Sequence, residues 1–410
     1  MDPFCRLPWF ILKDTLSLLP DLPTLHRLVN ASPAVAAFLR QENSFFPEIV
    51  EAILSHPIRD KGLLPWTRFL LRTMVFIWWR TYLRHSNSES DTRDNPLPSS
   101  YHAIISYFYF YTLDDPIQPI GYGTVPLPRS TPCVVLFRLL AFSTRLRQIT
   151  HACFHGLISR CMALKPERME TPDTEYNSFT AVVDQSFRPA GRPFSPVDIG
   201  PPSWAEEQRL TKAVLRVSLF FELRKAAVTH GSLNIGIETI QRLQIVQVKK
   251  FWGKILFHRN EVEEFRTVMM WLSQETGGVE GIESWMVSSL IPENLIYCCP
   301  ELPSLPREQL SRSESSMLRD VPGIIYSSYY RSMRHSPLRC VSFKVFRPFG
   351  FGIWDEKRMI ALGFLNPPTK DGKPWASGPH DTRLRFTWSS ILTQSQWEEV
   401  VELQSWTRRI

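Results

Sequence analysis

The residues best suited to metal chemistry form a histidine and cysteine cluster at His151, Cys153, His155 and Cys161. Imidazole and thiolate are preferred ligands of zinc, and two histidines four residues apart share one face of a helix. Cys153 would point away from that face, and no second pair of ligands completes a tetrahedral set. We therefore interpret the cluster as part of a helix with two buried thiols and two partly exposed imidazoles, and we predict no metal site.

The sequence contains none of the common catalytic motifs. The patterns G-x-S-x-G, H-E-x-x-H, G-x-x-x-x-G-K-[ST] and G-x-G-x-x-G are all absent. The carboxylate pairs at 114–115 and 355–356 could serve acid–base chemistry, but the second pair is better explained as the start of a helix over 357–362, where negative charge is favourable. The glycines at 350–352 predict a turn. We predict no enzyme, no catalytic residue and no cofactor.

Three features of the sequence predict an intracellular protein. Seven cysteines at irregular spacing, among them the adjacent pair 298–299, do not form a disulfide framework, which favours a reducing compartment. Lys13 and Asp14 interrupt the first apolar run, so no signal peptide is expected. The longest apolar run, 63–79, contains two arginines and is too short and too charged to span a membrane. We expect a protein of the cytoplasm or nucleus.

Basic residues exceed acidic residues, with 47 Lys and Arg against 40 Asp and Glu and a net charge of +7. A basic surface can bind nucleic acid by releasing counterions from phosphate. The basic residues are scattered, however, as at Arg138, Arg145 and Arg147, and no nucleic-acid-binding motif accompanies them. We interpret them as solvated helix faces, and nucleic acid is not the expected partner.

The sequence as a whole predicts a mainly α-helical protein. Hydrophobic residues make up 43% of the chain, 33 prolines outnumber 18 glycines, and few stretches alternate apolar and polar residues. A long buried helix is expected over 63–84 and one or two helices over 131–164. Segment 321–390 is predicted to be rich in loops and aromatic residues. Capping boxes, in which Ser or Asn precedes Glu by three residues, predict helix starts at Ser203–Glu206, Asn260–Glu263 and Ser395–Glu398.

The first forty residues predict three short helices with more aliphatic surface than they can bury alone. Pro20 ends a first helix that starts near Phe10, and Asp21 opens the second. Ser32 followed by Pro33 is typical of a third helix start. Apolar residues at helical spacing in the first two helices are Ile11, Leu12, Leu16, Leu19, Leu22, Leu25 and Leu28.

This N-terminal pattern resembles an F-box. The pairs Leu7-Pro8 and Ile11-Leu12 and the segment DLPTLHRLVNASPAV at 21–35 are similar to the F-box variant common in filamentous-fungal proteins, and segments 201–223 and 348–364 resemble stretches of the same proteins. The basic residue and Trp that end many F-boxes are missing. The resemblance implies docking on a Skp-type adaptor of a cullin–RING ubiquitin ligase, with adaptor-facing and internal apolar contacts from Leu7, Pro8, Ile11, Leu12, Leu16, Leu19, Leu22, Leu25 and Leu28.

We therefore expect a small three-helix F-box-like module at 1–40 and a larger, irregular helical domain at 41–410, with a loop or linker at about 165–202. The expected function is a substrate-recruiting adaptor that holds a target protein, of unknown identity, on its helical domain. One alternative is a stand-alone helical binding protein that contacts nucleic acid through its basic excess. Another is an enzyme that uses the histidine–cysteine cluster.

Overall fold

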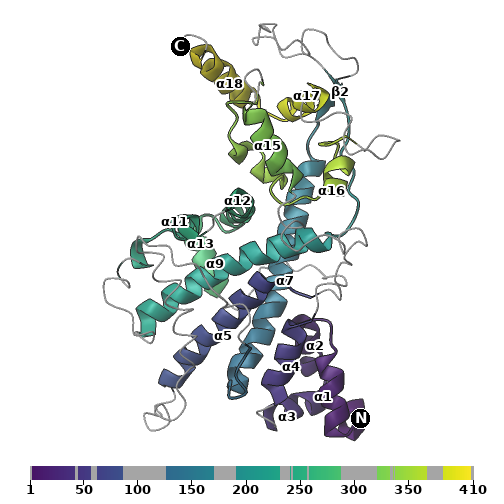
Figure 1. Cartoon of the computed structure of the whole chain (residues 1–410), viewed down its shortest axis with the longest axis vertical. Coiled ribbons are helices and arrows are strands. Elements are labelled where there is room, and N and C mark those ends of the chain that lie inside the picture. Colours follow the sequence, from purple (N-terminus) through teal and green to yellow (C-terminus); the bar gives the residue numbers. More distant parts are fainter. Residues whose placement is uncertain are drawn as a thin grey trace. The chain divides into compact units, whose positions relative to one another are not determined.

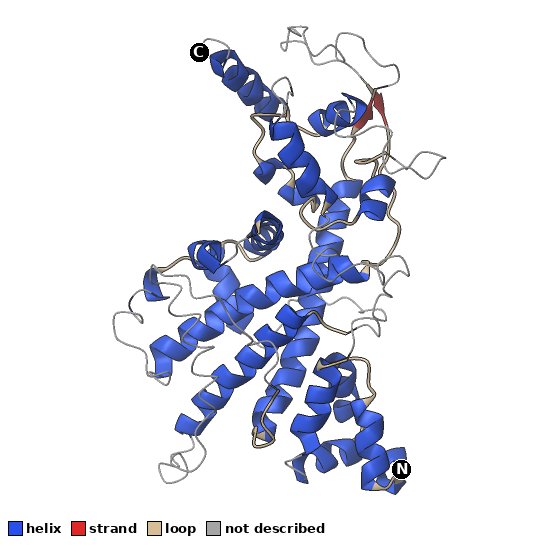
Figure 2. Cartoon of the chain, viewed as in Figure 1, coloured by secondary structure: helices blue, strands red, loops and turns tan. Residues whose placement is uncertain are grey.

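The computed structural model confirms a mainly α-helical protein (Figures 1 and 2). It describes residues 2–41, 45–56, 62–85, 126–169, 191–230, 241, 243–255, 258–287, 321–332, 336, 338–366 and 382–407. The α-helices are α1 (Trp9–Ser17), α2 (Leu22–Ala31), α3 (Pro33–Gln41), α4 (Phe45–Leu54), α5 (Pro65–His85), α7 (Cys133–Met162), α9 (Trp204–His230), α11 (Val248–Ile255), α12 (Arg259–Glu275), α13 (Val279–Val287), α15 (Pro322–Ser332), α16 (Glu356–Ala361), α17 (Thr382–Ser390) and α18 (Gln394–Thr407).

Short elements complete the described part of the chain. Three 3₁₀ helices are present among these residues, η1 (Pro3–Arg6), η6 (Phe343–Val345) and η7 (Arg347–Phe349). Strands β1 (Glu167–Arg168) and β2 (Arg192–Pro193) form an antiparallel pair, in which Glu167 faces Pro193 and Arg168 faces Arg192. This pair brings together the two ends of the predicted linker at 165–202, whose residues 170–190 lie outside the described part.

The chain divides into two compact units. The first unit contains Met1–Ala152 and Glu207–Glu314, and the second contains Cys153–Glu206 and Ser315–Ile410. Helices α7 and α9 therefore each contribute residues to both units. Among the described residues, no helix combines the length and the apolar character that a membrane crossing requires.

Helices α1 to α4 form a bundle at the start of the first unit (Figure 1). Asp21 caps α2 by accepting a hydrogen bond from the Thr24 amide at 2.6 Å, and Ser32 caps α3 through the Val35 amide at 3.1 Å. Both predicted helix starts are thereby confirmed. Helix α4 packs against α1, α2 and α3, so the bundle continues to Leu54, beyond residue 40, where the sequence predicts the module to end.

The rest of the first unit is built around α5 and the adjoining parts of α7 and α9. Helix α5 is buried on nearly every side, as predicted, with Met74, Val75 and Ile77 fully inaccessible. The bundle is fixed to this body by polar and aromatic contacts. Arg72 pairs with Glu51, and the rings of Phe46 and Phe137 lie 4.9 Å apart. The N-terminal helices are therefore joined to a larger core on one side.

The second unit has an aromatic core centred on Trp388. The rings of Tyr330, Phe346 and Phe351 lie 5.3, 5.1 and 4.8 Å from the Trp388 ring, and all four side chains are buried. All four residues belong to the segment 321–390, which was predicted to be rich in loops and aromatic residues. Aromatic residues of this segment therefore form the core of the second unit, and its loops and short helices surround them. The indole nitrogen of Trp388 donates to the carbonyl of Phe364 at 3.0 Å.

Two helix starts follow the predicted chemistry. Ser203 and Glu206 form a reciprocal capping box, with the Ser203 amide 2.9 Å from Glu206 Oε2 and the Glu206 amide 3.3 Å from Ser203 Oγ. Asp355 caps α16 by accepting from the Arg358 amide at 3.0 Å, which confirms the helix expected after the carboxylate pair 355–356.

Two predicted capping boxes are wrong. Helix α12 starts one residue before the predicted box at 260–263, and its N-cap is His258, which makes no side-chain cap. Near 395–398, the box is formed instead by Thr393, whose amide donates to Gln396 Oε1 at 2.9 Å, while the Gln396 amide donates to Thr393 Oγ1 at 3.3 Å. In both places the helix begins earlier than predicted, because more than one nearby polar residue satisfies the sequence pattern.

Several other expectations are resolved or lie outside the described residues. The segment 131–164 forms the single helix α7 rather than two. The glycine turn at 350–352 is confirmed, since Gly350 adopts a φ of +69°. The carboxylate pair at 114–115 and the cysteine pair at 298–299 lie in parts of the chain that the structure does not describe.

Candidate partner-binding surface

The N-terminal arm, residues 2–8, is tied to the start of α3 through Asp2. Its carboxylate accepts hydrogen bonds from Ser32 Oγ at 2.6 Å, the Ala34 amide at 3.0 Å and the Phe4 amide at 3.0 Å. These donors, led by Ser32, lower the pKa of Asp2. Pro8 then adopts the extended backbone of an N-cap and leads into α1. Asp2 thus fixes the start of the arm to α3, and Pro8 connects the end of the arm directly to α1.

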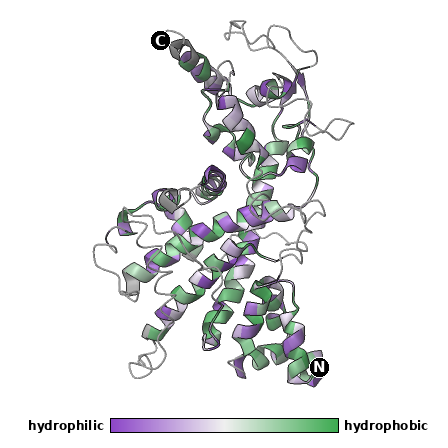
Figure 3. Ribbon diagram, viewed as in Figure 1, coloured by the Kyte–Doolittle hydropathy of each residue, from purple (hydrophilic) through white to green (hydrophobic). Residues whose placement is uncertain are grey.

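Helix α1 is apolar on two opposite sides. Leu12 and Leu16 face inward and are buried, whereas Ile11 and Leu18, seven residues apart, share the outer face. Leu18 is 78% exposed and Ile11 is 42% exposed, and Leu7 of the arm is also exposed. Figure 3 shows hydrophobic residues along this N-terminal segment. A surface helix normally presents polar residues to solvent, so its outer face needs a separate explanation.

Two exposed aromatic residues extend this surface. Trp9 is 57% exposed and stacks on Phe45 of α4, with ring centroids 5.2 Å apart, and Phe10 packs edge-on against Trp9. Lys13 lies over the Phe45 ring and pairs with Glu48 at 2.6 Å. The sequence analysis did not place Trp9 or Phe10 among the residues that contact a partner. Both lie at the start of a helix whose apolar stripe is formed by other residues, and this position could have indicated that their side chains are exposed. We call the set Leu7, Pro8, Trp9, Phe10, Ile11 and Leu18 the outer face of α1.

The nine residues implied by the resemblance occupy three different environments. Leu7, Pro8 and Ile11 are exposed, and Leu19 and Leu28 are half-buried. The remaining four lie in the core of the bundle and are not accessible to a partner in this structure: Leu12, Leu16, Leu22 and Leu25. They serve as internal contacts because the inner sides of α1 and α2 face the other helices of the bundle. A docking surface on this part of the chain therefore contains fewer residues than the nine that the resemblance implies.

The histidine–cysteine cluster does not form a metal site in the described part of the chain, where no group of three or more metal-binding side chains comes together. His151 is buried, with Nε2 3.3 Å from Glu207 Oε1, so the expectation that both imidazoles are partly exposed is wrong for this residue. Glu207 of α9 packs against this part of α7, so the His151 side chain is more buried than its sequence pattern indicated. Cys153 and Cys161 are buried as predicted, and burial raises the pKa of the Cys161 thiol to about 12.

The arginines of α7 are held by neighbouring acceptors. Arg147 Nη1 lies 2.9 Å from Asp21 Oδ2, and Arg138 Nη2 lies 3.0 Å from Glu222 Oε1. Arg145 donates to a backbone carbonyl, that of Trp285. Because two of these charges are paired with carboxylates, they do not add up to a free basic patch on this helix.

Comparison of the chain with models of known protein families, with curated proteins and with solved structures found no match. The resemblance to an F-box therefore rests on the sequence pattern of the N-terminal residues alone.

Proposed function

We propose that the chain is an F-box-type substrate-recruiting adaptor. In this proposal the outer face of α1 docks on a Skp-type adaptor of a cullin–RING ubiquitin ligase, and the helical body holds a target protein. The observation that carries the proposal is that α1 and its flanking residues bury Leu12 and Leu16 on one side and still present Leu7, Ile11 and Leu18 to solvent. Clustered exposed apolar residues are typical of protein interaction sites.

The free energy available from burying this surface is of the same order as the cost of association. Burying a Leu, Ile or Phe side chain that was fully exposed contributes about 1.5–3 kcal/mol. The six residues of the outer face of α1 are partly exposed, so their sum is smaller than six such contributions, yet it is comparable with the association cost of roughly 4–15 kcal/mol. Additional contacts from the half-buried Leu19 and Leu28 are consistent with the same partner.

The nucleic-acid alternative gains no support from the arginines named in its favour. Arg138 and Arg147 have carboxylate partners within 3.0 Å. Breaking these pairs to bind phosphate would leave Glu222 and Asp21 without their cations. Binding to nucleic acid would also weaken steeply with salt, whereas an apolar docking surface would not.

Co-purification tests the proposal. The full chain is co-expressed with a Skp-type adaptor, and captured proteins are identified by mass. We expect capture by the native chain and loss of capture by the triple variant Leu7→Ala, Pro8→Ala and Ile11→Ala. A matched control is Ile245→Ala, since Ile245 is 83% exposed but lies far from α1 in the sequence. Retained capture by a folded triple variant would contradict the proposal.

A further inference from the structure

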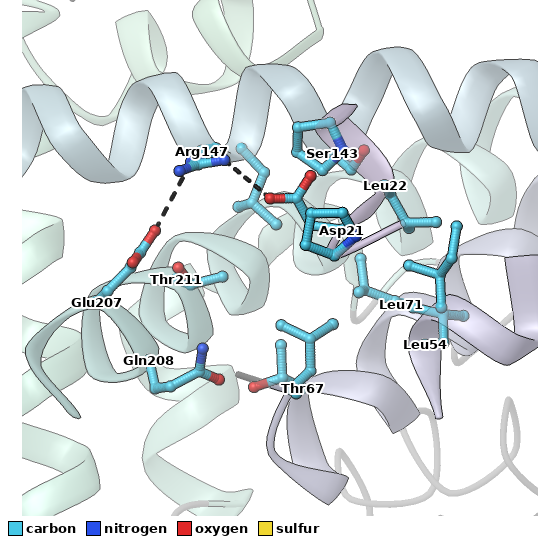
Figure 4. Close-up of a pocket in the computed structure, with 16 residues that line it drawn as sticks. Asp21, Leu22, Leu54, Thr67, Leu71, Ser143, Arg147, Glu207, Gln208 and Thr211 are labelled. Carbon is cyan, nitrogen blue, oxygen red and sulfur yellow. Dashed lines mark hydrogen bonds and ion pairs between the residues drawn. The ribbon is translucent and has the colours of Figure 1, made fainter. Parts of the chain in front are cut away.

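The first unit contains a cavity of about 80 Å³ where the α1–α2 turn and the end of α4 meet α5, α7 and α9 (Figure 4). One water molecule needs about 10–15 Å³, so this space could hold several waters or a small molecule. An engineered apolar cavity of roughly 150 Å³ accepts benzene, with its six carbon atoms, so the cavity of about 80 Å³ here holds roughly three carbon atoms.

Most of the cavity wall is aliphatic. Leu22 and Leu54 come from the bundle, and Leu71 comes from α5 (Figure 4). Ile53, Leu63 and Leu146 complete the apolar lining. Apolar walls make poor hydrogen-bonding partners for water, and cavities of this kind take up apolar molecules instead. The greater part of an occupant is therefore a compact hydrocarbon group.

One buried hydroxyl on the wall lacks a partner. Ser143 donates to the Leu140 carbonyl at 2.8 Å, and Thr211 lies 3.4 Å from the Thr150 hydroxyl. Thr67 Oγ1, by contrast, is fully buried and has no hydrogen-bond partner in the described structure. Figure 4 shows Thr67 on the side of the cavity that also carries the amide of Gln208. A buried hydroxyl without a partner costs free energy, which a ligand with one polar group would recover.

Each charged group on the wall already has a partner. Asp21 Oδ2 lies 2.9 Å from Arg147 Nη1, and Glu207 Oε1 lies 3.3 Å from His151 Nε2 and 3.9 Å from Arg147 Nε (Figure 4). A charged ligand would have to leave water for a mainly aliphatic wall whose charges already have partners. An uncharged ligand avoids this cost.

We infer that this cavity is a binding site for a small uncharged molecule that carries a compact branched aliphatic group and one hydroxyl. The aliphatic group occupies the leucine-lined part of the cavity, and the hydroxyl bonds to Thr67. This inference is independent of the docking proposed for α1, because none of the six residues of the outer face lines the cavity.

The test uses the full chain with labelled leucine and isoleucine methyl groups, and propan-2-ol as the probe in an NMR titration. We expect saturable shifts confined to methyls of the cavity wall. Thr67→Val keeps nearly the same shape but removes the hydroxyl, and it should weaken propan-2-ol binding by about fivefold, the value of one net hydrogen bond. Xenon, which has no hydrogen-bonding group, should bind the native chain and this variant equally well.

A second variant, Thr67→Ile, extends a methyl group into the cavity and should remove the saturable shifts caused by propan-2-ol. Far-UV circular dichroism confirms that each variant is folded. The inference is overturned if the native chain shows no saturable shifts, if the shifts are spread over methyls throughout the protein, or if the folded Thr67→Val variant binds propan-2-ol as well as the native chain does.

Discussion

Arg147 Nη1 of α7 lies 2.9 Å from Asp21 Oδ2 at the start of α2, and both side chains are largely buried. Asp21 also caps α2 through the Thr24 amide. A single carboxylate therefore starts a helix of the N-terminal bundle and fastens that bundle to the body of the first unit. Together with the Arg72–Glu51 pair and the Phe46–Phe137 contact, this ion pair joins the N-terminal bundle to the body.

Removing the arginine should be costly. We expect Arg147→Ala to lower the free energy of unfolding by about 3–5 kcal/mol, because it leaves Asp21 buried without its cation. Arg129→Ala is the matched control: Arg129 also pairs with a carboxylate, Glu48, at 2.9 Å, but its side chain is 80% exposed. Surface pairs contribute about 0–1 kcal/mol. Urea unfolding of both variants measures the difference, and equal losses would show that the buried pair has no special role.

Leu16 of α1 and Leu18, the residue that follows the helix, should respond very differently to truncation. Leu16 is fully buried and Leu18 is 78% exposed. We expect Leu16→Ala to destabilise the protein by about 2–5 kcal/mol through loss of burial and formation of a cavity. Leu18→Ala should change stability by no more than about 0.5 kcal/mol. If urea unfolding showed that Leu18→Ala is as destabilising as Leu16→Ala, the outer face of α1 would be part of the core instead of a docking surface.

Glu206 should make stability depend on pH. Burial, together with the nearby charge of Asp355, raises its pKa to about 7 despite the opposing charge of Arg358. The folded chain therefore keeps this proton up to about pH 7, whereas the unfolded chain releases it near its usual value of 4.5. The stabilisation from this group is present at low pH and is lost as the pH rises from 4.5 to 7.

The size and the test of this effect follow from the pKa difference. We expect the contribution of Glu206 to the free energy of unfolding to fall by about 2–3 kcal/mol between pH 5 and pH 8. Glu206→Gln cannot titrate and should lack this part of the pH dependence. Urea unfolding at both pH values compares the two proteins. The same pH dependence in both would show that Glu206 is ionised throughout this range.

Gly350 is required at its position for two reasons. Its φ is +69°, and a Cβ atom there would lie 2.4 Å from the buried ring of Trp354. We expect Gly350→Ala to destabilise the second unit by more than about 1 kcal/mol. Gly200→Ala is the control, since Gly200 also has a positive φ, +92°, but open space around it. If thermal unfolding gives equal losses for the two variants, backbone strain alone explains the effect.

The sequence predicted the helix starts best where a capping side chain marks them. Asp21 and Ser32 mark the starts of α2 and α3 in this way. The sequence could not decide which apolar residues of α1 face inward, because Ile11, Leu12 and Leu16 all fit one helical stripe, yet Ile11 is exposed and the other two are buried. That distinction depends on α4, whose packing against α1 comes from a later part of the chain.

Other features depend on contacts between residues far apart in the sequence. The pairing of Glu167 with Pro193 involves only two residues in each strand, too few for an alternating pattern to be recognised. The burial of His151 depends on α9, which supplies Glu207. The cavity near Thr67 is lined from five helices and the α1–α2 turn, and no local motif marks it.

The central claim is that a Skp-type adaptor covers the outer face of α1, and a titration of the two purified proteins tests it most directly. Isothermal calorimetry should show saturable binding of the adaptor by the native chain. The Leu7→Ala, Pro8→Ala, Ile11→Ala variant, with unchanged unfolding by urea, should bind at least about a hundredfold more weakly, as expected for loss of the central anchors of an interface. Binding of equal strength by this variant, or no binding by the native chain, would contradict the account.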